Sequence, residues 1–431
     1  MFSLNRILLV AAAVLGSLAT QAVHAQTTTT AQAVSPDDEL QGVIVLIRHG
    51  VRAPIETEIR SSSYNAQPWP AWSVPQGVLS EHGTKAAQLL AEYYRNRYST
   101  LLQNISCDHP GIYSETTTAQ RTMATAKAML PVLAPKCTIE VHQRPASAPY
   151  PLFSPIAGAD RQKLQDATLG RIGQQWSWFV NAFAEPMEEM HHVMATCSGK
   201  DCDPNKPDFR TVMIHNGVAS PRDPKVENPV TLGADFAEHF LLDYTEGKPM
   251  EQVGWGRVDR TRLNRLMQMN TLYHDFMGRT PYVAQVNSSN TAARISDSLS
   301  AMAGKSTPGA LGTPSDHFFL LVAHDGNIAT LGGLLRMEWL LPDQSFNATP
   351  PGGGYAFELH RNKTTGAQTV RVVFITQTLD QMRFLTPFQG DDLPSIAPIF
   401  LPGCSGPGPD YACTLDGFRQ MVSSVVLSQR D

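Results

Sequence analysis

Two short segments concentrate the side chains whose types and spacing could do chemistry. They are Arg48-His49-Gly50-Val51-Arg52-Ala53-Pro54 and His324-Asp325-Gly326-Asn327. Guanidinium groups are permanently charged and match phosphate oxygens two at a time. A neutral imidazole beside a phosphate held in this way could attack phosphorus and form a phosphohistidine. The leaving alkoxide would then need a proton, and a carboxylic acid donor implies an acidic pH optimum.

These residues therefore have distinct expected roles in phosphoryl transfer. His49 is the candidate nucleophile, and Arg48 and Arg52 flank it as phosphate-binding cations. Asp325 is the candidate proton donor, with His324 beside it as a further cation on the phosphate. Little else is required, because phosphoryl transfer depends chiefly on positioning and charge stabilisation.

Each segment directly follows an apolar run that predicts a buried strand. Val43–Ile47 and Phe318–Ala323 are uninterrupted and of strand length, whereas Val370–Ile375 alternates less cleanly. Ligand sites of open α/β sheets form outside the carboxyl ends of strands. If the first two strands are neighbours, both segments reach one pocket. We also expect Pro54 to begin a helix whose N-terminal amides would face the phosphate.

Helical patterns separate the predicted strands. Ser80 is expected to cap one helix, and further helices are predicted over residues 119–130 and 255–277. Strands that alternate with helices favour an α/β fold, a sheet flanked by helices.

The stretch between residues 151 and 255 has a different character, with more helical patterns and more loops. It predicts a helical cap inserted into the α/β domain, which would then comprise residues 40–150 and 256–431. The boundaries of this division are approximate.

The N-terminal residues carry features of export. Residues 1–25 have Arg6, an apolar stretch and a small-residue cleavage motif, Val23-His24-Ala25, as in a signal peptide. The apolar stretch is shorter than the roughly 20 residues of a membrane span. Residues 26–39 are Thr-rich and predict a disordered lead-in. We expect an exported protein with no membrane association after cleavage.

Composition excludes several classes of protein. The chain has 431 residues, of which 42% are hydrophobic and 17% charged, as in an ordinary folded protein with a large core. Its formal net charge of -5 gives no basic field, so nucleic acid is not an expected partner. An anionic substrate would need a local basic pocket. The oligomeric state is not predicted.

Six cysteines fit an exported protein with disulfide bonds. Fifteen complete pairings are possible in principle. Cys197 and Cys202 are close in sequence, as are Cys404 and Cys413, which suggests two local loops and leaves Cys107 with Cys137. A zinc site is the competing interpretation, but no ligand spacing typical of zinc supports it. No metal or other cofactor is expected.

The motifs resemble those of the histidine acid phosphatase family, in particular its bacterial periplasmic branch of phytases and glucose-1-phosphatases. The resemblance extends from about Val43 to Phe418 and includes Leu331-Gly332-Gly333, Pro350-Pro351-Gly352-Gly353 and all six cysteines. It implies a phosphoglycerate-mutase-like fold, a mixed sheet flanked by helices, with an inserted helical cap and the active site between the two. It also implies the three disulfide pairs named above.

The resemblance adds a third phosphate-binding arginine. It maps onto Arg121, in Ala119-Gln120-Arg121-Thr122. Without the family this residue would be an ordinary helix arginine. The implied activity is hydrolysis of phosphate esters, with phytate, other inositol phosphates or sugar phosphates as the substrate.

Three positions depart from the pattern of efficient phytases and leave the substrate open. Such phytases commonly carry Thr-Lys after the first motif, where this chain has Ile55-Glu56, and a carboxylate there would repel a polyanion. They usually carry Thr after the His-Asp pair, where this chain has Gly326. A glucose-1-phosphatase with little phytase activity is the alternative.

Two other classes of function compete. A phosphoglycerate-mutase-like transferase would return the phosphate to a second hydroxyl, but the signal peptide, the disulfides and the His324-Asp325 pair argue against it. A catalytically inactive binding protein would be expected to have lost His49 or Asp325, and both are present.

Overall fold

The computed structural model describes residues 37–55, 63–103, 105–144, 151–173, 181–212 and 229–427. The predicted signal peptide, residues 26–36 of the predicted lead-in, and Glu56 lie outside the described residues. The first strand begins at Asp38, so the last two residues of that predicted lead-in, Asp38 and Glu39, belong to it.

A mixed sheet forms the centre of the protein. Its strands are β1 (Asp38–Arg48), β2 (Ile112–Thr116), β3 (Val141–Gln143), β4 (Phe318–Ala323), β5 (Gly354–Asn362), β6 (Gln368–Thr376), β7 (Ser395–Pro398) and β8 (Cys413–Thr414). Their order is β3-β2-β4-β1-β5-β6-β7, with β8 paired to β6. The strands from β3 to β1 run parallel, and those from β5 to β8 pair antiparallel. The predicted fold class is confirmed.

The two apolar runs that precede the chemical motifs are neighbouring parallel strands. In β1 and β4, Val43 pairs with Phe318 and Arg48 pairs with Ala323. Both strands are buried on both faces, as continuous apolar runs require. Because the two strands end at the same level, the residues that follow them emerge side by side.

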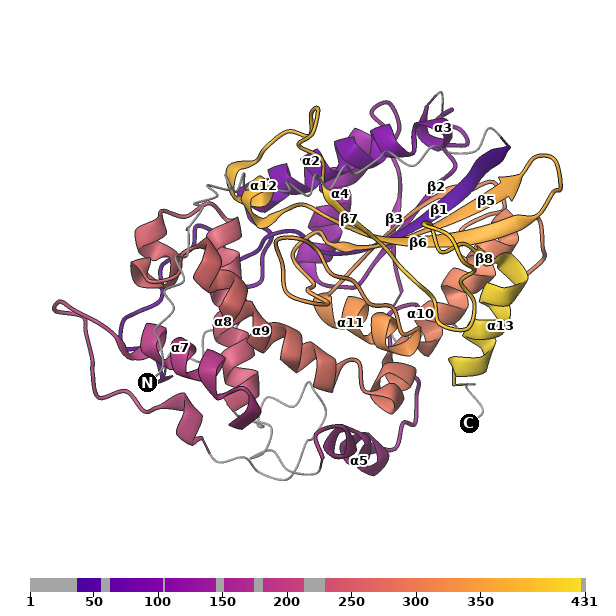
Figure 1. The fold of residues 1–431 in the computed structure, drawn as a ribbon. Coiled ribbons are helices and arrows are strands. Elements are labelled where there is room, and N and C mark those ends of the chain that lie inside the picture. Colours follow the sequence, from indigo (N-terminus) through magenta and orange to yellow (C-terminus); the bar gives the residue numbers. More distant parts are fainter. Residues whose placement is uncertain are drawn as a thin grey trace, which may run out of the picture. The chain divides into compact units, whose positions relative to one another are not determined.

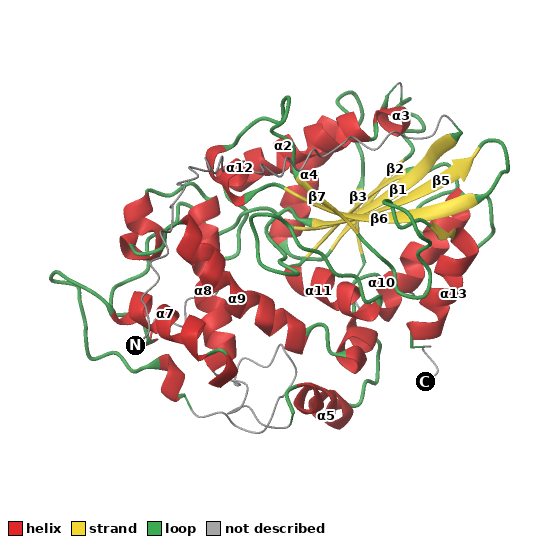
Figure 2. Cartoon of the chain, in the orientation of Figure 1, coloured by secondary structure: helices red, strands yellow, loops and turns green. Residues whose placement is uncertain are grey.

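Helices cover both faces of the sheet (Figures 1 and 2). One face carries α2 (Glu81–Arg97), α3 (Ser99–Leu102) and α4 (Gln120–Leu133), and the other carries α10 (Pro281–Met302), α11 (Asp325–Leu334) and α13 (Leu415–Val425). Alternate side chains of β1 contribute to the two cores: Val45 and Ile47 pack with the first group, whereas Ile44 and Leu46 pack with the second.

One predicted helix boundary is confirmed and two are wrong. The side chain of Ser80 caps α2 by accepting a hydrogen bond from the Gly83 N–H at 2.8 Å. The helix expected from residue 255 begins instead at Arg260, where Asp259 is the N-cap. Pro54 does not start a helix, since residues 53–55 are irregular and the next described helix is α2. Proline fits an irregular segment as well as a helix start.

A further group of helices lies between β3 and α10 in the sequence. It comprises α5 (Arg161–Arg171), α7 (Ala184–Ala195), η2 (Phe209–Thr211), α8 (Pro229–Thr245), η3 (Met250–Gly256) and α9 (Arg260–Met277). Helices α7, α8 and α9 share one apolar cluster, which α12 (Leu379–Phe384) also joins. This cluster extends to Met277, beyond residue 255, where the sequence predicted the cap to end. The boundaries of the cap stay a prediction.

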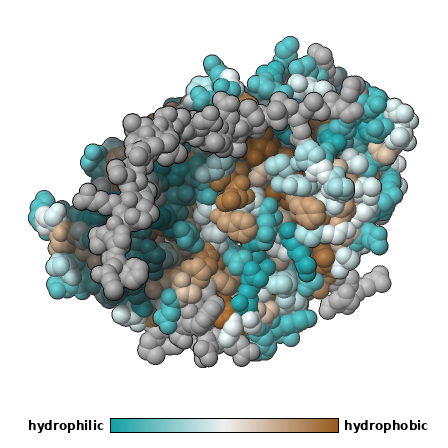
Figure 3. All heavy atoms as spheres, in the orientation of Figure 1, coloured by the Kyte–Doolittle hydropathy of each residue, from teal (hydrophilic) through white to brown (hydrophobic). Residues whose placement is uncertain are grey.

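The predicted disulfide pairs are confirmed. Cys107 is bonded to Cys137, Cys197 to Cys202 and Cys404 to Cys413. None of the helices in the described ranges is both long enough and apolar enough to cross a membrane. On the face drawn in Figure 3, hydrophobic side chains occur in patches among hydrophilic ones.

Candidate active site

The structure brings the two chemical motifs together at the ends of β1 and β4. The main-chain N–H of His49 donates to the carbonyl of Ala323 at 3.0 Å. The rings of His49 and His324 lie edge to face, with their centroids 5.4 Å apart. The convergence expected from the sequence is therefore present in the fold.

The imidazole of His49 is held in one orientation. Its Nδ1 lies 2.9 Å from the carbonyl oxygen of Gly50, which can only accept, so Nδ1 carries the proton and Nε2 keeps its lone pair. Burial, with the charges of Arg48 and Arg52, lowers the pKa of His49 well below its ordinary value. The ring is therefore neutral, which is the form that a nucleophile requires.

The main chain around His49 is fixed by neighbouring elements. The carbonyl of His49 accepts from the Gly352 N–H at 3.1 Å, and the carbonyl of Val51 accepts from the Ser80 N–H at 3.1 Å. Helix α2 approaches so closely that a Cβ on Gly83 would lie 2.1 Å from the Val51 carbonyl oxygen. Only glycine allows this contact.

Two buried arginines share a buried carboxylate. The guanidinium of Arg48 is fully buried; its Nη2 contacts Glu238 Oε1 and lies 3.1 Å from Asp325 Oδ2. Arg52 Nη2 lies 3.7 Å from the same oxygen of Glu238. Glu238 comes from α8, so this helix orients both cations. Sequence reasoning missed Glu238, because no local motif marks it.

Arg121 and His324 meet at the same place from different elements. Arg121 lies in the first turn of α4, and its Nη2 is 3.4 Å from His324 Nδ1. The other ring nitrogen of His324 lies 3.0 Å from the hydroxyl of Thr117. Burial, together with the charge of Arg121, lowers the pKa of His324 to about 4. The structure thus brings Arg121 beside His324, and its phosphate-binding role stays a prediction.

Asp325 is the first residue of α11, directly after the strand end. Its Oδ1 accepts from the Gly326 N–H at 2.7 Å, and its side chain keeps 26% exposure. Burial alone would raise the pKa of Asp325, but the charges of Arg48 and His274 outweigh it and hold this pKa well below its ordinary value. Asp325 is therefore ionised when the pocket holds no anion.

His274 is a second residue near the site that sequence reasoning passed over. It is buried on α9, and burial lowers its pKa, against a raising influence from Asp325. Neither its spacing nor its neighbours in the sequence signal this position.

Exposure shows where an anion would enter. Arg48, His49 and Arg52 are all buried, whereas Arg121, His324 and Asp325 are partly exposed. Solvent therefore reaches the candidate site at the second group of residues. Within the described residues no cluster of three His, Cys, Asp or Glu side chains is arranged to hold a metal ion.

Comparisons of sequence and of structure found known proteins that are similar to this chain. The phytase AppA of Escherichia coli strain K12 is 30% identical over 402 residues, which cover 90% of this chain and 92% of that protein. A glucose-1-phosphatase of Salmonella typhimurium strain LT2 is 26% identical over 430 residues, 96% of this chain and 98% of that protein. A solved structure of Hafnia alvei phytase in complex with tartrate matches with a TM-score of 0.79 and 30% identity, covering 91% of this chain and 98% of that one.

The family model described as histidine phosphatase superfamily (branch 2) matches residues 39–375. That range begins with β1 and ends within β6, so it contains both chemical motifs and Arg121. The chain belongs to branch 2 of the histidine phosphatase superfamily.

Proposed function

We propose that this protein is a histidine acid phosphatase that hydrolyses phosphate monoesters through a phosphohistidine on His49. One observation carries the proposal. A neutral imidazole, with Nδ1 committed to a carbonyl and Nε2 unprotonated, lies beside the guanidinium groups of Arg48 and Arg52. A lone pair beside a bound phosphate is the requirement for in-line attack on phosphorus.

In the first half-reaction, Nε2 of His49 forms a bond to phosphorus while the bond from phosphorus to the ester oxygen breaks. Protonated Asp325 donates its proton to that oxygen, so the product leaves as a neutral alcohol. Arg48, Arg52 and Arg121 balance the charge on the three remaining phosphate oxygens.

In the second half-reaction, a water molecule attacks the phosphohistidine and the bond from phosphorus to Nε2 breaks. The carboxylate of Asp325 now accepts the proton that the water loses. Inorganic phosphate leaves, and His49 and Asp325 return to their starting states.

The protonation of Asp325 implies an acidic pH optimum. In the empty site Arg48 and His274 keep its pKa low. A bound phosphate neutralises the arginines and adds negative charge, so it raises this pKa. A phosphate monoester itself binds its second proton near about pH 6, and below that pH it brings the proton with it.

The substrates are small phosphate esters, with phytate or a sugar phosphate as the physiological one. The phytase and glucose-1-phosphatase relatives support both. Ile55-Glu56 and Gly326, in the places where efficient phytases commonly carry Thr-Lys and Thr, favour the alternative of a glucose-1-phosphatase with little phytase activity. Three disulfides support residence in the periplasm or outside the cell.

Glu56→Lys tests the substrate choice. A charge reversal near a polyanion changes the interaction free energy by about 1–2 kcal/mol at a protein surface. The ratio of kcat/KM on phytate to that on glucose 1-phosphate should therefore rise roughly tenfold. An unchanged ratio would show that residue 56 does not face the substrate.

His49→Ala tests the activity itself. The wild-type protein should release phosphate from p-nitrophenyl phosphate between about pH 4 and pH 6, and the variant should have no turnover. Labelled phosphate that is transferred to water rather than to an added alcohol would exclude a transferase. A wild-type protein that releases no phosphate would contradict the proposal, and so would an active His49→Ala variant.

A further inference from the structure

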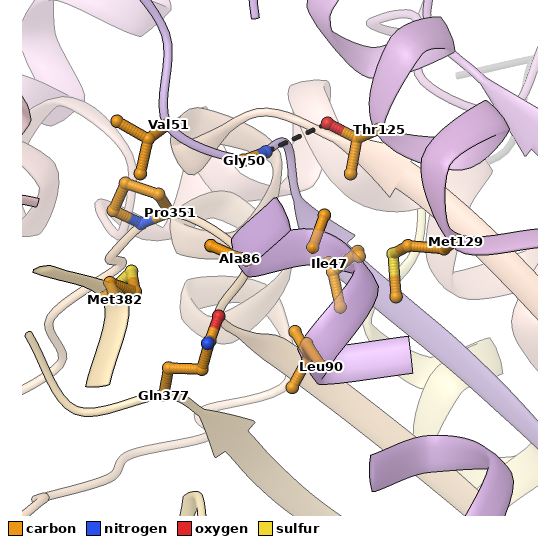
Figure 4. A pocket seen from close by; sticks show the side chains of 12 residues that line it. Ile47, Gly50, Val51, Ala86, Leu90, Thr125, Met129, Pro351, Gln377 and Met382 are labelled. Carbon is orange, nitrogen blue, oxygen red and sulfur yellow. Dashed lines mark hydrogen bonds between the residues drawn. The ribbon is translucent and has the colours of Figure 1, made fainter. Parts of the chain in front are cut away.

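The hydroxyl of Thr125 joins the loop that carries the proposed nucleophile to the helix that carries Arg121. It accepts a hydrogen bond from the Gly50 N–H at 3.0 Å and donates one to the carbonyl of Arg121 at 2.7 Å. Thr125 lies one turn after Arg121 on α4 and is 1% exposed. Figure 4 shows the bond between Gly50 and Thr125.

The direction of both bonds follows from the atoms. A hydroxyl has one hydrogen, and a main-chain carbonyl can only accept, so this hydrogen points to Arg121. A lone pair is then left for the Gly50 N–H. That N–H belongs to the peptide between His49 and Gly50, whose carbonyl accepts from Gly352. The peptide is thus held from two sides, by α4 and by the segment before β5.

Packing does not replace this bond. Beneath this segment lies a small cavity, about 10 Å³, lined by Gly50, Thr125 and Gln377 together with apolar side chains such as Ile47, Leu90 and Met129 (Figure 4). These apolar groups offer no acceptor to the Gly50 N–H. The Thr125 hydroxyl is thus the directional contact from α4 to this peptide.

We propose that Thr125 is a positioning residue, whose hydroxyl sets the place of the nucleophile relative to the helix of Arg121. The inference rests on the proposed role of His49. The two groups come from separate elements, and both must contact the same phosphate. A shift of about 1 Å between them is enough to slow attack on phosphorus by up to about 100-fold.

Thr125→Val is the direct test, because valine has nearly the same shape and lacks the hydroxyl. Thr125→Ser keeps the hydroxyl. Thr168→Val is the matched control: Thr168 is also a buried helical threonine that donates to the carbonyl four residues before it, Leu164, on α5. We would measure kcat/KM on p-nitrophenyl phosphate and on glucose 1-phosphate at about pH 5, with the thermal unfolding midpoint of each variant.

Thr125→Val should lower kcat/KM on the order of tenfold or more, and by the same factor on both substrates, because a displaced nucleophile slows attack on every ester. Thr125→Ser should recover most of this loss. Thr168→Val should lower the unfolding midpoint without changing kcat/KM, which separates positioning from a purely structural role.

Three outcomes would overturn the inference: a folded Thr125→Val variant within about twofold of the wild type, a Thr125→Ser variant as impaired as the valine one, or a loss confined to glucose 1-phosphate. If Thr125→Val does not fold, Thr125→Ala is compared with Thr125→Ser by the same criteria. An active His49→Ala variant refutes the proposed function. An inactive His49→Ala variant beside an unimpaired Thr125→Val variant refutes only the role of Thr125.

Discussion

Arg48 lies between two carboxylates that differ in burial. Glu238 is buried and contacts the guanidinium directly, whereas Asp325 is 3.1 Å away and partly exposed at the opening of the pocket. In the proposed mechanism, an arriving phosphate competes with Asp325 for the same cation. Binding of the anion and protonation of Asp325 are therefore coupled in this mechanism. Glu238 keeps Arg48 in place while phosphate replaces Asp325 as its partner.

The role of Asp325 predicts a dependence on the leaving group. Asp325→Asn removes the proton donor and keeps the shape of the side chain. The kcat/KM on glucose 1-phosphate should fall on the order of 100-fold, whereas that on p-nitrophenyl phosphate, whose leaving group needs little protonation, should fall only a few-fold. Steady-state kinetics on both substrates checks this. Equal losses would contradict the assignment, and the unfolding midpoint controls for misfolding.

Sequence reasoning could find the residues that follow strands but not those that reach the site from helices. Arg48, His49 and Asp325 were predicted because their types are diagnostic and their strands are continuous apolar runs. Glu238 and His274 lie on the amphipathic helices α8 and α9, where a buried polar residue has no sequence signal. Only tertiary packing brings them to the arginines.

At the level of secondary structure, the contact between α2 and the segment that carries His49 fixes the main chain of the candidate site. A Cβ on Gly83 would lie within 3 Å of three main-chain atoms of Val51. Main-chain atoms cannot rotate away as a side chain can. The loop and the helix must therefore separate if any larger residue replaces this glycine.

Gly83→Ala should accordingly lower both stability and activity. We expect a loss of roughly 1–3 kcal/mol in the free energy of unfolding, as for other overpacked sites. The kcat/KM should fall on the order of tenfold through displacement of His49. Gly170→Ala is the matched control, since this helical glycine on α5 has open space around it. Urea unfolding and steady-state kinetics decide the outcome; a Gly83→Ala variant that behaves like the control would contradict the prediction.

The elements themselves were more predictable than their ends. The strands β1 and β4 and the cap of α2 follow from local pattern, whereas the expected helix after Pro54 is absent from residues 53–55. Helix α11 begins at Asp325, so its N-terminus, rather than one after Pro54, lies at the proposed site. Local sequence cannot decide which helix reaches a site.

A second buried network of charges lies at the opposite end of the sheet from the active site. Glu358 on β5 accepts hydrogen bonds from Arg97 Nη2 at 2.9 Å and from the hydroxyl of Tyr98 at 2.8 Å, and His360 lies 3.5 Å away. Burial alone would raise the pKa of Glu358, but the nearby His360 and the charge of Arg97 lower it to about 2. The network thus stays ionised at the acidic pH proposed for catalysis.

The pKa of Glu358 is lower in the folded protein than in the unfolded chain, so the ionised side chain stabilises the folded protein above about pH 4.5. This stabilisation is lost as the pH falls through about 2. Glu358→Gln cannot ionise. The free energy of unfolding of this variant should be lower than that of the wild type, and the difference should be largest near about pH 6. The difference should shrink by roughly 3 kcal/mol as the pH falls to 2. Urea unfolding across this pH range measures the deficit. A difference that does not change with pH would contradict the assigned pKa.

The position of β1 between β4 and β5 also bears on the order of folding during synthesis. The strand that leads into His49 is made first, but its two partners begin only at Phe318 and Gly354. Until most of the chain has been made, both edges of β1 are open to wrong pairing. Truncated chains that end before β5 would therefore have the nucleophile but no assembled catalytic machinery, and a full-length chain acquires activity only in a late, long-range step.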